Sequence, residues 1–278
     1  MTRPSLPQQS EAEQGAAEQG GAPLLEARNL TRLFGRGDNV VRAVDDVSFT
    51  VGRNEIVTVV GESGSGKSTL ARLLLRLLDP TSGSILLDGK DITAIEGRDV
   101  KSYWREVQAV FQDPFSAFNQ FFTVRRLLQR SQGLLSEAEQ LVGAEDRMIN
   151  ALEQVGLKAK DVLGKWPHQL SGGQRQRVMI ARALMMRPRV LIADEATSML
   201  DASLRANILN VLMDLRRDQD MTIIFITHDI GQACYVSDRI LAMCKGELVE
   251  SGPTDEVIFA PQHEYTQGLL ADVPRLHT

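Results

Sequence analysis

The sequence predicts an α/β fold: a mostly parallel sheet with a small antiparallel β-subdomain and a helical insertion. Three observations support this prediction. Apolar runs of strand length alternate with segments whose apolar residues recur at helical spacing. A glycine-rich loop at residues 61–69 joins one such strand to one such helix. Residues 113–170 lack strand signals altogether.

Residues 1–23 are rich in Gln, Glu, Gly, Ala and Pro and have few apolar side chains to bury. Such a segment is expected to form a disordered tail, because ordering it would cost entropy without compensating burial. The folded domain is then expected to span residues 24–278, with a C-terminal extension from about residue 252. The chain has 278 residues and is 43% hydrophobic, which is sufficient for a packed core.

Composition excludes several functional classes. A net charge of -5 argues against a general nucleic-acid or anionic-membrane binder. No apolar run approaches the ~18 residues of a membrane span, and the N-terminus lacks an apolar signal-peptide core, so a soluble, non-secreted chain is expected. Cys234 and Cys244 are too few for a disulfide framework or a four-thiolate metal site. Both are expected to be reduced core residues.

The N-terminal elements read as short strands. Leu24–Arg28 and Val47–Val51 alternate as half-buried strands do, and a connection containing Gly35 and Gly37 lies between them. Residues 84–88, followed by a turn at Asp88-Gly89, indicate another strand pair. Val107–Phe111 is a buried strand by composition. Together they predict the antiparallel subdomain and the start of the next layer.

The loop GESGSGKST fits the phosphate-binding pattern Gly-x-x-x-x-Gly-Lys-Ser/Thr at every fixed position. Its glycines let backbone N–H groups converge on phosphate oxygens, Lys67 offers a charge to the β and γ phosphates, and the Ser68 hydroxyl suits Mg²⁺. A chance glycine-rich turn is disfavoured, because the apolar strand Ile56–Val60 precedes the loop. A helix follows it, marked by Leu70, Leu73, Leu74 and Leu77. The predicted nucleotide-binding residues are Gly61, Glu62, Ser63, Gly64, Ser65, Gly66, Lys67, Ser68 and Thr69.

The helical insertion is predicted over residues 113–170. Its apolar residues recur at helical spacing in three groups: Val124, Leu127 and Leu128; Ala138, Leu141 and Val142; Ile149, Leu152 and Val155.

Strand and helix alternation then resumes. A helix over residues 173–186 should stop at Pro188, and a strand should cover Val190–Ala193. A strand is predicted over residues 221–227, where Ile223–Ile226 are apolar on both faces, as in a parallel strand covered by helices. Between these strands, one helix face is marked by Leu204, Ile208, Val211, Leu212 and Leu215. Residues 240–244 and 247–250 form a predicted hairpin across Lys245-Gly246.

Two acids, Asp194 and Glu195, end the strand that starts at Val190. The carboxyl edge of an α/β sheet is where ligands bind, so Asp194 is a candidate Mg²⁺ ligand and Glu195 a candidate base for the attacking water. Two acids after a strand also suit a helix start, a reading that the upstream phosphate loop disfavours. Ser171, Gly172, Gly173 and Gln174 open another helix, where free N–H groups suit an anion but also an ordinary N-cap.

These motifs resemble those of a known family. GESGSGKST, Gln112 in VFQDP, LSGGQRQR, VLIADEATSMLD and ITHD, in this order, look like the ATPase subunit of an ATP-binding cassette (ABC) transporter, a P-loop NTPase. The segments PHQLSGGQRQRVMIARAL and PQHEYTQGLL resemble the oligopeptide and dipeptide importer branch. The resemblance implies hydrolysis of ATP to ADP and phosphate with Mg²⁺, coupled to uptake of peptides or of related solutes such as oligosaccharides.

The resemblance also assigns roles to residues. Phe34 would stack on adenine, although core packing is the alternative for a lone aromatic. Gln112 would join the Mg²⁺ shell, and His228 would contact the γ-phosphate, the alternative being a simple cap after a strand. The signature residues Ser171–Gln174 would contact ATP bound to an opposite subunit, and Asp201 would lie in the loop linking the two sites.

The implied partners are a second ABC ATPase subunit, two transmembrane permease subunits and an extracytoplasmic substrate-binding protein, with no nucleic acid. The chain would then lie at the cytoplasmic face of the inner membrane as a peripheral subunit. Four phenylalanines beside Gln112 are candidates for a permease-docking groove or for subdomain core: Phe115, Phe118, Phe121 and Phe122.

Several features depart from this branch or bear on its rivals. Phe118-Asn119-Gln120 replaces the usual Leu-Asn-Pro, and Met199 stands where Ala is common. No cysteine follows Cys244, so no iron-sulfur cluster is expected. An exporter ATPase and a non-transport ABC ATPase are the alternatives. Against them, Gly164–His168 differs from the exporter loop before the signature, and the chain has neither a long coiled-coil insertion nor two cassettes.

Overall fold

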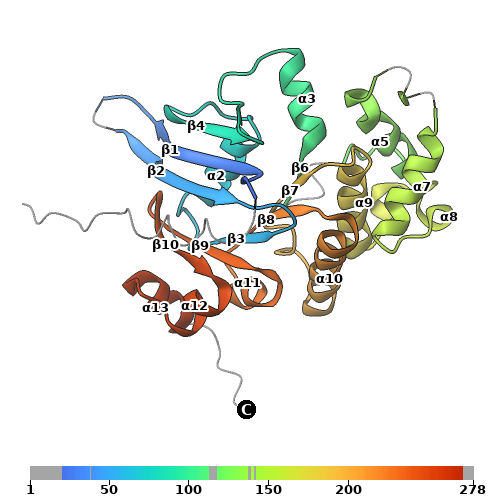
Figure 1. Ribbon diagram of the computed structural model, residues 1–278. Coiled ribbons are helices and arrows are strands. Elements are labelled where there is room, and N and C mark those ends of the chain that lie inside the picture. Colours follow the sequence, from blue (N-terminus) through green and yellow to red (C-terminus); the bar gives the residue numbers. More distant parts are fainter. Residues whose placement is uncertain (1–20, 38, 113–117, 137–138, 141, 272–278) are drawn as a thin grey trace, which may run out of the picture.

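The structure, a computed structural model, describes residues 21–37, 39–112, 118–136, 139–140 and 142–271. It contains two sheets and a group of helices that lies to one side of them (Figure 1). The predicted tail, residues 1–23, falls almost wholly outside the described residues, as do Phe115 and two members of the second helical group, Ala138 and Leu141.

The four-stranded antiparallel sheet has the order β2-β1-β4-β5. Its strands are β1 (Leu25–Phe34), β2 (Val41–Val51), β4 (Ser82–Leu87) and β5 (Lys90–Asp91). The predicted antiparallel β-subdomain is therefore confirmed, and β1 and β2 are longer than the alternating segments that predicted them. The reason is that both strands continue as a hairpin past their buried parts, with Phe34 paired to Val41.

The six-stranded sheet has the order β10-β9-β3-β8-β7-β6. Five neighbouring strands are parallel, and β10 pairs with β9 in an antiparallel hairpin at the edge. The strands are β3 (Ile56–Val60), β6 (Val107–Phe111), β7 (Val190–Asp194), β8 (Thr222–Thr227), β9 (Arg239–Cys244) and β10 (Glu247–Pro253). All residues of β3, β7 and β8 are buried, as expected for strands covered on both faces.

The two faces of this sheet pack against different layers. One face meets the helix that follows the phosphate loop and the antiparallel sheet, and the other meets the helical group (Figure 1). Side chains of β7 alternate between these two faces: Ile192 packs on the side of the antiparallel sheet, and Leu191 packs on the side of the helical group. The helices are α2 (Lys67–Leu74), α3 (Arg98–Glu106), α5 (Val124–Ser131), η2 (Gln132–Leu134), α7 (Ala144–Gln154), α8 (Ala159–Val162), η3 (Pro167–Gln169), α9 (Gly172–Leu184), α10 (Ala202–Gln219), α11 (Ile230–Val236), α12 (Thr254–Phe259) and α13 (Glu264–Ala271).

Four side chains are not where the sequence predicted them. Leu77 lies beyond the end of α2 and is 50% exposed, because the chain turns at Leu75 and Arg76. Val142 lies in a bend before α7 and is 74% exposed. Cys234 is on the exposed side of α11 and Cys244 is half-buried, so the prediction that both are core residues was wrong. Apolar spacing alone does not show where a helix stops.

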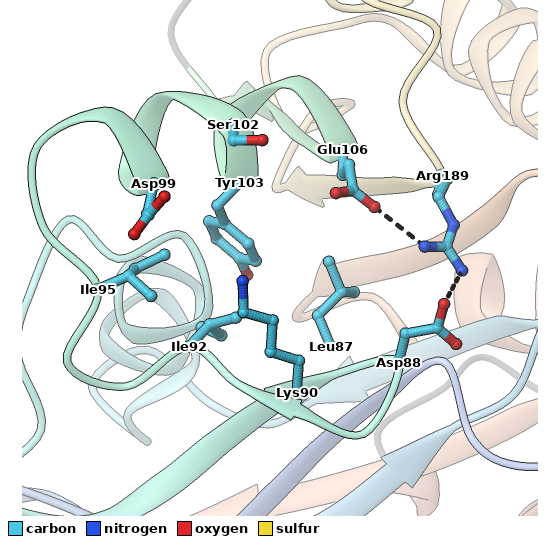
Figure 2. A pocket seen from close by; sticks show the side chains of 10 residues that line it. All are labelled: Leu87, Asp88, Lys90, Ile92, Ile95, Asp99, Ser102, Tyr103, Glu106 and Arg189. Carbon is cyan, nitrogen blue, oxygen red and sulfur yellow. Dashed lines mark hydrogen bonds and ion pairs between the residues drawn. The ribbon is translucent and has the colours of Figure 1, made fainter.

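Ion pairs join the antiparallel subdomain to the parallel sheet around a cavity of about 210 Å³ (Figure 2). The guanidinium of Arg189, just before β7, lies 2.9 Å from Asp88 in the β4–β5 turn and 3.0 Å from Glu106 at the end of α3. Arg53 also pairs with Asp88. The bond from Arg189 holds the pKa of the Asp88 carboxyl below its usual value. Because Arg189 precedes β7, this cavity lies at the opposite sheet edge from the phosphate loop.

Two hairpin turns have the same backbone but different surroundings. Gly89 follows Asp88 and Gly246 follows Lys245, and all four residues have positive φ. A Cβ at Gly89 would meet nothing within 4 Å, whereas a Cβ at Gly246 would lie 2.7 Å from the carbonyl oxygen of Arg42. Gly246 is therefore constrained by packing as well as by φ.

We expect Gly246→Ala to reduce the free energy of unfolding by ~1–3 kcal/mol more than Gly89→Ala does, because only the former places a Cβ too close to a main-chain carbonyl. Both variants carry the same cost of positive φ, so their difference isolates the clash. Urea unfolding of the two variants measures it, and equal losses would contradict this account.

Candidate functional site

The predicted phosphate-binding, Mg²⁺-binding and catalytic residues lie at one edge of the parallel sheet. The register pairs Val60 with Thr227 and Phe111 with Asp194, so parallel strands end side by side. The phosphate loop follows β3, Gln112 follows β6 and His228 follows β8. Sequence segments more than 160 residues apart therefore share one edge, as expected for the ligand-binding edge of an α/β sheet.

The phosphate loop is closely packed from behind. A Cβ at Gly61, where φ is 154°, would lie 2.2 Å from the carbonyl oxygen of Met243 in β9. A Cβ at Gly66, where φ is 107°, would lie 2.2 Å from that of Ala43 in β2. The loop is also held by a bond from the Gly246 N–H to the Ser65 carbonyl, 2.9 Å. These two glycines are required by close approach of other main chains, and the loop's shape depends on both sheets.

Lys67, near the end of the phosphate loop, is buried against the earlier residues of that loop. Its Nζ donates to the carbonyl oxygens of Gly61 and Glu62, each at 2.7 Å, and to the Ser65 hydroxyl at 3.3 Å. Burial lowers the pKa of Lys67, while the negative charges of Glu195, Asp194 and Glu62 act in the opposite direction. An ammonium group held in this way is placed to exchange loop carbonyls for phosphate oxygens.

The structure brings Ser68 and Asp194 together, as predicted for a Mg²⁺ site. The Ser68 hydroxyl donates to Asp194 Oδ1 at 3.2 Å, and Asp194 is buried. Burial raises the pKa of Asp194, the bond from Ser68 lowers it, and the Glu195 charge raises it. A hydroxyl and a carboxylate are ligands that suit Mg²⁺, which usually takes one or two protein oxygens plus substrate phosphates. Gln112 is exposed and follows the strand next to Asp194.

Glu195 and His228 form a pair at this edge. His228 Nδ1 lies 3.2 Å from Glu195 Oε1, and the Glu195 side chain is the less exposed of the two. Glu195 has φ of 49°, in the left-handed region, and its N–H donates to the Ile226 carbonyl of β8 at 2.9 Å. The strained backbone turns the chain sharply after β7 and places the carboxylate beside β8 and the histidine.

A buried polar bridge beneath this pair was not predicted from the sequence. The Thr197 hydroxyl donates to Gln232 Oε1 at 2.5 Å, and Gln232 Nε2 donates to Asp229 at 2.8 Å. Asp229 also N-caps α11 and lies 3.5 Å from Arg205 of α10. Gln232 therefore ties the loop after Glu195 to the residue after His228. Its position inside an apolar-looking helix gave no sequence signal.

The signature residues form a helix start. The Ser171 hydroxyl accepts from the Gln174 N–H at 3.2 Å and the Gln174 side chain accepts from the Ser171 N–H at 3.1 Å, which is a capping box. Within a single subunit, the interpretation of these residues as an N-cap is therefore confirmed. A Cβ at Gly173 would lie 2.8 Å from Leu204 of α10, and Asp201 caps that helix by accepting from the Leu204 N–H. The two motifs pack together on α9 and α10, within the helical side of the molecule (Figure 1).

Two aromatic predictions have mixed outcomes. Phe34 is 38% exposed at the end of β1, with the Arg32 guanidinium 4.8 Å from its ring centroid, so it is not core. Of the phenylalanines after Gln112, Phe118 is buried and Phe121 is 82% exposed. Phe122 lies under two guanidinium groups, Arg126 at 4.3 Å and Arg130 at 5.2 Å. The described members therefore divide between core and surface.

Across the part of the chain that the structure describes, no helix is both long and apolar enough to cross a bilayer.

We expect Asp194→Asn to stabilise the nucleotide-free chain at pH 7, because its raised pKa means that the folded state binds the proton more tightly than the unfolded state. The stability of the parent should therefore fall as pH rises above the ordinary Asp value, and the variant should lack this loss. A gain on the order of 1 kcal/mol, about 2–4 °C, is expected at pH 7, and little gain below pH ~4.

Thermal melts of both proteins from pH 4 to 7 measure this. Asp218→Asn is the control, because a bond from Arg217 lowers the pKa of Asp218 and no gain is expected there. A less stable Asp194→Asn at pH 7 would show that the carboxylate is stabilised by its neighbours despite its burial.

We also expect Gln232→Leu to destabilise the fold by ~1–3 kcal/mol, because it leaves the Thr197 hydroxyl buried without its acceptor. Adding Thr197→Val should recover part of that loss, so the two substitutions should be non-additive. Denaturant unfolding of the single and double variants tests the bridge; strictly additive losses would argue against it.

The comparisons with known proteins identify the family of this chain. The ABC transporter family model matches residues 44–198, which run from β2 through the phosphate loop and the signature to the loop after β7. A putative peptide import ATP-binding protein of Brucella ovis is 39% identical over 91% of this chain and 79% of its own length. The oligopeptide transport ATP-binding protein OppF of Streptococcus mutans is 39% identical over 90% of this chain and 82% of its own.

Solved structures give the same result. The ATP-binding cassette MJ0796, in a dimeric post-hydrolysis state bound to ADP and Pi, is 28% identical with a TM-score of 0.71 over 83% of this chain and 98% of its own. The protein cbiO1 from Clostridium perfringens, part of the ABC transporter complex cbiONQ, is 29% identical with a TM-score of 0.75 over 91% of this chain and 96% of its own. With the phosphate loop, the two acids and His228 at one sheet edge, this fold and these relatives, the chain belongs to the ABC transporter family.

Proposed function

We propose that this chain is the ATP-binding and ATP-hydrolysing subunit of an ABC importer that powers uptake of oligopeptides, dipeptides or related small solutes such as oligosaccharides. The observation that carries the proposal is the Glu195–His228 pair, 3.2 Å apart at the sheet edge that holds the phosphate loop. The relatives named for peptide import support importer over exporter and over a non-transport ATPase.

In this mechanism the ATP phosphates occupy the loop at residues 61–69, and Phe34 stacks on the adenine. Lys67 gives up the carbonyls of Gly61 and Glu62 for phosphate oxygens. Mg²⁺ would be held by Ser68, Asp194 and Gln112, and when bound it would neutralise charge on the phosphates. Glu195 takes a proton from the attacking water, and His228, whose Nδ1 lies 3.2 Å from that carboxylate, would orient it and donate to the γ-phosphate.

The site is proposed to be complete only in a pair of chains. Within one chain the signature residues sit on α9, whereas the phosphate loop opens α2 beneath the antiparallel sheet (Figure 1). A second ATPase subunit, a paralogue or another copy, would bring Ser171–Gln174 to this loop, with Asp201 between the two sites. ATP then closes the pair and its hydrolysis reopens it, a population shift driven by differential binding.

The pair is proposed to act on two transmembrane permease subunits, served by an extracytoplasmic substrate-binding protein, from the cytoplasmic face of the inner membrane. The exposed Phe121 and the arginine-covered Phe122 follow Gln112 in the chain and are candidates for permease contact.

We expect Glu195→Gln to retain ATP binding but to lower turnover by roughly 10²- to 10⁴-fold, the usual contribution of a general base. ATP affinity by calorimetry and phosphate release by the assembled transporter measure the two effects separately. Glu247→Gln, an exposed acid at the start of β10, is the matched control and should hydrolyse ATP as the parent does. Near-parental turnover in Glu195→Gln would remove the assigned base.

Uptake measurements test the transport proposal. A strain without this gene should lose uptake of a labelled tripeptide, the parent gene should restore it, and Glu195→Gln should not. Loss of labelled oligosaccharide uptake with peptide uptake intact would reassign the cargo. Retention of both would refute the importer assignment.

A further inference from the structure

The C-terminal extension reaches the phosphate loop. The N–H of Glu62 donates to the hydroxyl oxygen of Tyr265, on the first turn of α13, at 2.8 Å. These residues are 203 positions apart in the chain. Nothing in the phosphate-binding pattern predicts this contact, and it joins the far end of the fold to the site.

The segment that carries Tyr265 is anchored independently of the loop. The Glu250 carboxylate of β10 accepts from the N–H groups of Gln262 at 2.7 Å and His263 at 3.1 Å. His263 Nδ1 accepts from the Tyr265 N–H at 3.1 Å, and Thr266 beside it is buried. Because α13 is fixed to the sheet by Glu250, the hydroxyl of Tyr265 is held in place by the fold rather than by the loop.

The peptide groups at Glu62 are thereby bonded on both sides. The Glu62 carbonyl accepts from Lys67, while its N–H donates to Tyr265. In the proposed mechanism Lys67 leaves that carbonyl when phosphates bind. The Tyr265 bond does not involve the Lys67 ammonium, so a change of partner by Lys67 leaves this bond free to hold its end of the loop.

We propose that Tyr265 is a positioning residue for the nucleoside triphosphate: its hydroxyl fixes the Glu62 peptide of the phosphate loop, so that the C-terminal helix contributes to ATP affinity. A preorganised loop loses less conformational freedom on binding, which appears as tighter affinity. This inference concerns the binding of ATP alone and does not depend on which solute is transported.

Tyr265→Phe, which removes the hydroxyl and keeps the ring, tests the inference in the full-length chain. We expect the dissociation constant for Mg-ATP, measured by calorimetry, to rise about 2- to 10-fold, the effect of one net hydrogen bond. The melting temperature without nucleotide should stay close to that of the parent, because the Glu250 anchor remains. In the assembled transporter KM for ATP should rise while kcat is unchanged.

Tyr235→Phe is the matched control. Tyr235 lies on α11, and its hydroxyl bonds to Asn210 at 2.9 Å, away from the loop. This variant should bind Mg-ATP like the parent. An equal rise in both variants would show a general effect of hydroxyl loss and would overturn the inference.

Glu250→Gln supplies a second measurement. It weakens the anchor, so it should raise the dissociation constant in the same direction, and it should add little to Tyr265→Phe because both act through one contact. Parental affinity in Tyr265→Phe would overturn the inference. A lowered melting temperature with parental affinity would assign Tyr265 a structural role only.

Discussion

The phosphate loop takes its shape from the main chains packed directly behind it. Met243 in β9 and Ala43 in β2 present carbonyl oxygens so close to Gly61 and Gly66 that neither position admits a Cβ. The Lys245-Gly246 turn adds a bond to Ser65 from the same side. The loop is thus clamped between the antiparallel sheet and the edge hairpin, and the relative placement of the two sheets fixes the anion site.

The charged groups of the site are better suited to a bound ligand than to the fold without one. Burial lowers the pKa of Lys67 and raises that of Asp194, so both charged forms are disfavoured where they are placed. The two charges only partly compensate each other. A chain that keeps such groups at the edge of an otherwise consistent α/β core does so for binding, since functional sites are where proteins depart from ideal packing.

The sequence was informative where a periodic pattern covers a whole element. The mostly apolar, buried strands β3, β7 and β8 and the turns at Gly89 and Gly246 could be identified from residue types alone. The phosphate loop and the two acids that end β7 could be placed at one edge of the sheet, because that is where α/β sheets bind ligands, and the role of the histidine after β8 came from the family resemblance.

What escaped prediction depends on contacts between distant segments. Leu77 continues the apolar spacing of α2 but lies past its end, and Cys234 was misplaced because its type suggests burial. Gln232 and Tyr265 lie in helices whose sequences do not indicate that either side chain has a role at the site. Their roles appear only when Thr197 and the Glu62 peptide are brought beside them by the fold.

The left-handed backbone at Glu195 limits which residues fit without strain at the position of the base. Glu is disfavoured at this φ, whereas Gly, which has no Cβ, and Asn, whose short polar side chain tolerates the left-handed region, adopt it at lower cost. Replacing the glutamate by either would relieve the backbone while removing the base. The strain and the base therefore reside in the same residue, and a subunit with either replacement is expected to fold and bind ATP without hydrolysing it.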